Sequence, residues 1–111
     1  MALTKPQALM IAARSMDLFV AEKLLVKDAT GTVVVSDSAP DVKIDLLLKD
    51  LDADDGTYGL HAIQFIRTAL TQDCAALNHT LSITKEDLLD DTQVETIYDL
   101  AALVKANASK S

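Results

Sequence analysis

Three aspartates at alternate positions, Asp50, Asp52 and Asp54, have the spacing of the first ligands in an EF-hand calcium loop. Such a loop needs a glycine at its sixth position for a sharp turn and a glutamate at its twelfth for bidentate coordination. The sequence has Asp55 and His61 at those two positions. We therefore expect no specific metal site here, only a general attraction for divalent cations. Acids in front of a helix also favour its positive end, which explains the cluster without a metal.

The residues that could act as bases or nucleophiles form no catalytic pattern. His61 and His79 are 18 positions apart on what we expect to be one helix, so they cannot converge on one zinc ion. The single cysteine, Cys74, lies on an apolar helical stripe, which predicts a buried thiol. The sequence has no glycine-rich phosphate loop and no Gly-x-Ser-x-Gly motif. We therefore expect no enzymatic activity, no catalytic residue and no cofactor.

The excess of acidic over basic residues limits the classes of molecule that this protein can be expected to bind. The chain has 17 Asp and Glu against 10 Lys and Arg, for a net charge of -7. Repulsion from phosphates argues against direct binding of nucleic acid. The balance suits a protein partner with a basic surface, and it equally serves solubility. The sequence shows no signal peptide and no apolar run of the ~20 residues that a membrane span needs, so we expect a cytoplasmic protein without membrane contact.

The elements that would carry these residues follow from the spacing of the apolar positions. Residues 25–27 could pair with the β-branched run 33–35 as a small hairpin, or this stretch could be an extended loop. The core is expected to contain Val42, Leu46, either Leu48 or Leu51, and Phe65. Helices are expected over about 5–25, 41–51, 58–79 and 93–106. A capping box at Thr84 is expected to open a further short helix, and one at Thr92 is expected to open the last helix.

The fold class that results is all-α. We expect one domain over residues 1–111, a bundle of four to five helices, with the hairpin after the first helix left open. Residues 1–4 and 107–111 are expected to fray.

The order of these helices resembles that of acyl carrier proteins and the related peptidyl carrier domains. Residues 83–104, "ITKEDLLDDTQVETIYDLAALV", are similar to the family's short third helix followed by its Thr-x-x-Asp-Leu final helix. Residues 46–56, "LLLKDLDADDG", are similar to the approach to its attachment site. The resemblance implies a small acidic bundle in which a serine at the start of the second helix carries phosphopantetheine.

That serine is missing from this sequence. One alignment places Asp55 at the attachment position, and the other, through 59–63, places Ala62 there. Neither side chain has a hydroxyl group, so phosphopantetheine cannot be esterified at either. Ser38, in the chain's one Asp-Ser pair, is the remaining candidate for a displaced attachment site.

Two functions follow as hypotheses. The first is an acyl-carrier-like protein that is not an enzyme and that docks on a protein partner without carrying phosphopantetheine. Its contact surface would be the acidic loop and the helix after it, with Asp52, Asp54, Asp55, Leu60, His61, Gln64 and Arg67. The second is an unrelated acidic interaction protein, such as an inhibitor, an immunity or antitoxin-like factor, or a phage-encoded mimic of nucleic acid whose carboxylates imitate phosphates.

Overall fold

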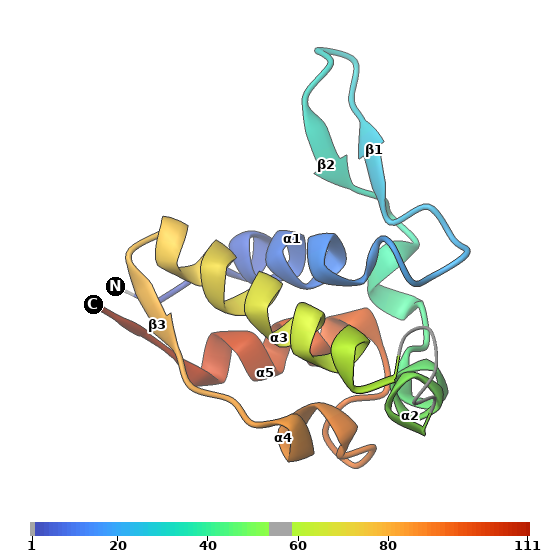
Figure 1. Cartoon of the computed structure of the whole chain (residues 1–111). Helices are drawn as coiled ribbons and strands as arrows, with labels where there is room; N and C mark the ends of the chain where they lie inside the picture. The colour runs from blue at the N-terminus through green and yellow to red at the C-terminus, as the bar shows by residue number, and fades with distance from the viewer. Residues whose placement is uncertain (1, 54–58) are drawn as a thin grey trace.

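The computed structural model describes residues 2–53 and 59–111, and it combines helices with two small sheets (Figure 1). The prediction of an all-α fold is therefore wrong. The elements in chain order are α1 (Lys5–Met16), β1 (Leu25–Lys27), β2 (Val33–Val35), the 3-10 helix η1 (Ala39–Asp41), α2 (Asp45–Ala53), α3 (Gly59–Ala76), β3 (His79–Leu81), α4 (Lys85–Leu89), α5 (Ile97–Asn107) and β4 (Ala108–Lys110).

The hairpin that the sequence left open is present, with Leu25 opposite Val35 and Lys27 opposite Val33. Its turn is held by Asp28, whose Oδ1 accepts hydrogen bonds from the backbone N–H groups of Thr30 and Thr32 at 2.9 and 3.0 Å. Gly31 has a φ of 83°, which glycine adopts at little cost. The hairpin projects from the helical body (Figure 1).

A second sheet, absent from the sequence-based expectation, joins β3 to β4. Its strands are antiparallel, with Leu81 opposite Ala108 and His79 opposite Lys110. The expected helix over 58–79 therefore ends earlier, at Ala76, and residues 107–111, which we expected to fray, include a paired strand. A bundle of helices alone does not describe the molecule.

Three other helix boundaries also differ from the expectation. Helix α1 ends at Met16, because the Met16 carbonyl accepts bonds from Phe19 N–H at 2.9 Å and Val20 N–H at 3.2 Å in a turn. Helix α2 begins only at Asp45, since the preceding residues pair in extended form with residues 95–97. Helix α5 begins at Ile97, because the capping box that forms is the one from Thr96 and not the one from Thr92.

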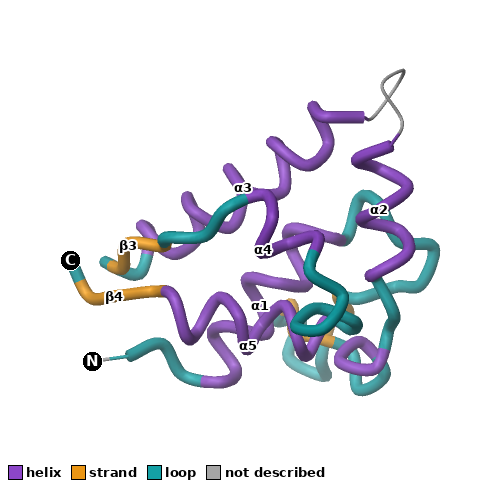
Figure 2. Tube along the Cα trace, turned by 90° about the horizontal axis from the view of Figure 1, so that it is seen from below, coloured by secondary structure: helices purple, strands orange, loops and turns teal. Residues whose placement is uncertain are grey.

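One hydrophobic cluster lies between the helices. Helix α1 packs against α5 and α3, and α2 packs against α3 and α4 (Figure 2). The cluster includes Ile44, Ile66, Leu70 and Leu100, and it includes Cys74, whose thiol is buried as predicted. Desolvation by burial is the main cause that raises the pKa of Cys74, which keeps it a neutral, unreactive thiol.

Candidate functional site

Two acidic segments that are far apart in the sequence meet in the fold. Residues 41–55 and 84–95 together contain 11 of the 17 acids and three of the 10 bases. Helix α2 packs against α4, so the described parts of these segments form one surface, which we call the acidic face (Figure 1). The acids of 41–55 are evident as a cluster in the sequence, whereas no local signal indicates that 84–95 lies beside them in the fold.

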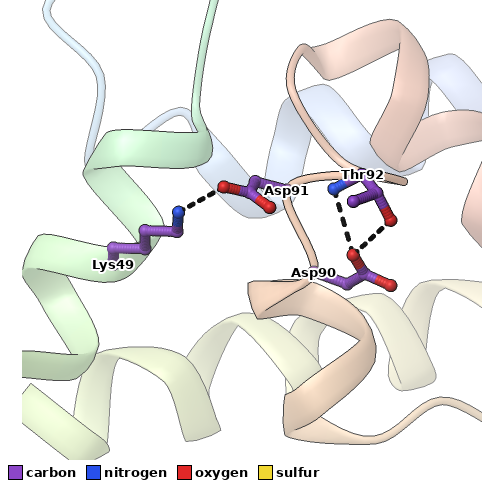
Figure 3. A network of polar contacts seen from close by, with 4 residues as sticks. All are labelled: Lys49, Asp90, Asp91 and Thr92. Carbon is purple, nitrogen blue, oxygen red and sulfur yellow. Dashed lines mark hydrogen bonds and ion pairs between the residues drawn. The ribbon is translucent and has the colours of Figure 1, made fainter.

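Ion pairs hold the two segments together. The Nζ of Lys85 lies 2.8 Å from Oδ1 of Asp52, and the bond angles there do not meet those of a hydrogen bond, so the attraction is electrostatic. Lys49 pairs with Asp91 across the same junction (Figure 3). Each lysine thus neutralises one carboxylate in place, and the remaining acids leave the face negative.

The turn after α4 presents two adjacent carboxylates. Oδ1 of Asp90 accepts hydrogen bonds from the hydroxyl and the backbone N–H of Thr92 (Figure 3). Its Oδ2 accepts one from the amide of Gln93 at 2.8 Å. The Thr92 hydroxyl is the largest cause that holds the pKa of Asp90 below its ordinary value. The Asp90 carboxylate is therefore fixed in a negative form whose position is set by the turn.

Helix α2 also exposes an apolar side chain next to Asp50. Leu46 is 69% exposed, which corrects the prediction that it faces the core. Ile44, Leu48 and Leu51 are the residues of this stretch that are buried. Leu46 lies two positions before the buried Leu48, roughly 200° around the helix from it, and so faces solvent. Asp50, one turn after Leu46, is exposed on the same side.

The residues predicted to contact a partner are placed as follows. Asp54 and Asp55 lie outside the described residues, as do the side chains of Leu60 and His61, which belong to the first turn of α3. Asp52 is paired to Lys85, and Gln64 is exposed. Arg67 is half-buried and donates from Nη2 to the Ile83 carbonyl at 3.3 Å, so it anchors the segment before α4.

The two described candidates for prosthetic attachment differ in access. Ala62 is 4% exposed and belongs to the hydrophobic core, so a side chain at this position could not present an arm to solvent. Ser38 is exposed at the start of η1, with its Oγ 3.4 Å from that of Ser36. Asp55 lies outside the described residues.

The metal-ligating residue types are scattered in the part of the chain that the structure describes. In these residues, no three His, Cys, Asp or Glu side chains are grouped so that they could hold one ion. Asp50 and Asp52 of the predicted loop are described, whereas Asp54 is not. His79 is buried in β3, where its Nδ1 lies 2.8 Å from the Leu77 carbonyl oxygen.

Comparisons with protein-family models, with curated proteins and with solved structures find no match for this chain. Over the described residues, no helix is both long enough and apolar enough to span a bilayer.

Proposed function

We propose that this protein acts by binding a protein partner that has a basic surface, and that the acidic face is the contact. The observation that carries the proposal is the convergence of two acidic segments, the first of which also exposes Leu46 on α2. Neither segment alone would give a broad negative surface. The protein has no catalytic role and carries no prosthetic group in this proposal, which keeps the docking part of the carrier-like hypothesis.

The two kinds of residue have different tasks on such a surface. The carboxylates of Asp50, Glu86 and Asp90 raise the rate of encounter with a basic partner, and salt weakens this steering. Leu46 is an apolar contact that becomes buried only in the complex, worth on the order of 2 kcal/mol if it is fully covered. The ion pairs of Lys49 and Lys85 hold α2 against α4, so the face is formed before the partner arrives.

The proposal is tested with two matched triple variants in affinity capture from the source cells. Leu46→Ala/Asp50→Asn/Glu86→Gln changes one leucine, one aspartate and one glutamate of the acidic face, all exposed. The control Leu18→Ala/Asp37→Asn/Glu22→Gln removes the same groups from exposed positions elsewhere. We expect proteins retained by the wild type and the control to be lost from the acidic-face variant, and to be released as salt rises.

Retention of the same proteins by both variants would contradict the proposal. The absence of a prosthetic group is checked separately, by incubation with coenzyme A and a phosphopantetheinyl transferase followed by intact-mass measurement. We expect no gain in mass. A gain that disappears in Ser38→Ala would place an arm at Ser38 and reject the non-carrying function.

A further inference from the structure

A cavity whose lining includes no residue of the acidic face lies between α1 and α5. It has a volume of about 280 Å³. Its floor contains Ala8 and Ala101, both buried, and these small side chains let the two helices approach closely. Pro6 and Leu9 of α1 and Ala102 of α5 add further apolar surface to the lining. We call this cavity the α1–α5 groove.

The charged side chains of the groove's lining are both cationic. They are Lys5 of α1 and Lys105 of α5, in a chain whose net charge is -7. Within the described residues, neither lysine pairs with an acid in the ion pairs of the fold, which join Arg14, Lys43, Lys49 and Lys85 to carboxylates. The groove is therefore an apolar site with a positive charge that nothing described neutralises.

Helix stability explains only one of the two lysines. Lys105 lies in the last turn of α5, where a cation is favourable near the negative end of the helix dipole. Lys5 lies in the first turn of α1, where a cation is unfavourable, and that turn contains no acid. An anion bound next to Lys5 would offset the unfavourable interaction between the lysine's charge and the positive end of the α1 dipole.

The two lysines belong to the same end of the groove. The start of α1 and the end of α5 lie on the side of the molecule where both chain termini are found (Figures 1 and 2). Tyr98, which also lines the groove, precedes Lys105 by seven residues of α5, or about 10 Å along the helix. The groove thus has a cationic end, an apolar middle and an aromatic ring toward its other end.

We propose that the α1–α5 groove binds a small amphiphile that has a carboxylate head and a straight apolar chain about 10 Å long. The carboxylate lies between Lys5 and Lys105, and the chain lies along Leu9 and Ala102 toward Tyr98. A cavity of this volume is at the small end of ligand sites, whereas a protein partner would need ~800 Å² on each side. The lining of the groove shares no residue with the acidic face, so this proposal can be tested independently of the proposed function.

The test is a titration of the full chain with octanoate, followed by ¹H–¹⁵N NMR. We expect saturable shifts confined to the first turns of α1 and to α5, with a Kd on the order of 1 mM. Octylammonium, which has the same chain and the opposite charge, is expected to give no saturable shifts there. Equal binding of octylammonium, or octanoate shifts centred elsewhere, would overturn the proposal.

Two variants separate the charge from the apolar surface. Lys5→Gln/Lys105→Gln is expected to weaken octanoate binding about tenfold, and Lys23→Gln/Lys27→Gln, which removes two exposed lysines elsewhere, is expected to leave it unchanged. Ala102→Phe fills the groove from an exposed position and is expected to abolish binding with the melting temperature retained. Undiminished binding in either groove variant would overturn the proposal.

A second copy of this chain is the competing occupant of the groove. Sedimentation of the wild type and of Ala102→Phe without octanoate decides this point. We expect the two proteins to have the same mass in solution. A larger mass for the wild type that Ala102→Phe reduces would show that the groove is a contact between copies, and would overturn the proposal.

Discussion

Asn78 connects α3 to β3 through a left-handed backbone conformation, with a φ of 62°. Its N–H donates to the Ala75 carbonyl at 2.9 Å, and its own carbonyl accepts from Ser111 N–H at 2.9 Å. This one residue therefore ends a helix and fixes the strand that follows it. Asparagine tolerates the left-handed region better than most residues other than glycine.

A substitution at Asn78 tests this conformation. Asn78→Ala is expected to lower the free energy of unfolding by about 1 kcal/mol, because alanine is strained where φ is positive. Asn78→Gly, the matched control, is expected to be neutral or slightly stabilising. Urea unfolding measures both. Equal losses in the two variants would show that the Asn78 side chain, and not its φ, stabilises the turn.

Asp28 and Asp90 each accept hydrogen bonds from a threonine two residues later, and the pKa of both carboxyl groups is lowered from 3.8. The largest cause is the side-chain bond from Thr30 for Asp28 and from Thr92 for Asp90. Because the folded pKa lies below the ordinary value, the stability that each group adds is present above about pH 3.8. It is lost as the pH falls through the folded pKa.

A carbon-13 titration of the carboxyl groups checks these two turns. Thr92→Val is expected to raise the pKa of Asp90 toward 3.8 and to leave that of Asp28 unchanged, whereas Thr30→Val does the reverse. The backbone N–H bonds remain in both variants, so part of each shift should persist. If neither pKa moved, the hydroxyl groups would not be the main cause.

At the scale of the element, α3 presents neighbouring residues with opposite roles. Ile66 is fully buried, whereas Phe65 is 49% exposed and makes an edge contact with Phe19, with ring centroids 6.0 Å apart. Phe65 was expected in the core, but it lies about 100° around the helix from Ile66, at the border of the buried stripe. Its contribution to stability is therefore that of a partly covered aromatic pair.

The two residues provide a matched test. Phe65→Ala is expected to cost about 1 kcal/mol, the order of an aromatic pair contact, whereas Ile66→Ala is expected to cost about 3 kcal/mol because it leaves a cavity. Chemical unfolding of the two variants under the same conditions gives the comparison. A loss for Phe65→Ala as large as that for Ile66→Ala would place the Phe65 ring in the core after all.

The second sheet attaches the end of the chain to the fold. Removal of residues 108–111 deletes β4, leaves β3 without its partner strand and uncovers Leu81, which is buried. We expect a loss of about 2 kcal/mol and faster amide exchange in β3. Removal of Ser111 alone deletes one backbone bond and one hydroxyl contact with Thr80, and should cost less. Unchanged exchange in β3 after the larger truncation would show that β4 does not protect it.

At the scale of the whole molecule, charge repulsion opposes the compact state. The net charge is -7, and the four ion pairs between described residues are partly exposed, so each contributes less than about 1 kcal/mol. Salt weakens both effects, with a screening length of about 10 Å at 0.1 M. We expect repulsion across the acidic face to be the larger effect, because its described residues include nine acids and only three bases.

Melting in sodium chloride checks this balance. An increase from low salt to 0.3 M is expected to raise the melting temperature by about 4 °C, equivalent to roughly 1 kcal/mol for a domain of this size. The control is Asp50→Asn/Glu86→Gln, which removes two exposed negative charges that form no ion pair with a described residue and should respond less to salt. A melting temperature that falls with salt would show that the ion pairs outweigh the repulsion.

The sequence alone determined the features that depend on neighbours along the chain. Apolar spacing predicted a helix that contains α3 and the burial of Cys74, and the capping box at Thr84 predicted the start of α4. The β-branched run 33–35 left a hairpin and an extended loop as alternatives, and the structure has the hairpin. The net charge and the lack of a hydroxyl group at Ala62 also follow from composition and order. These features are local, so a window of a few residues contains their physical cause.

Only the tertiary structure decided which segments meet. Four features depend on contacts between residues that are distant in the sequence. They are the pairing of β3 with β4, the exposure of Leu46, the contact of 41–55 with 84–95, and the α1–α5 groove. A helical pattern predicts that one face of a helix is buried. Which face of α2 this is, with Leu48 in the core and Leu46 in solvent, depends on the elements that α2 packs against. These contacts depend on how the whole chain packs, and a local sequence pattern does not contain that information.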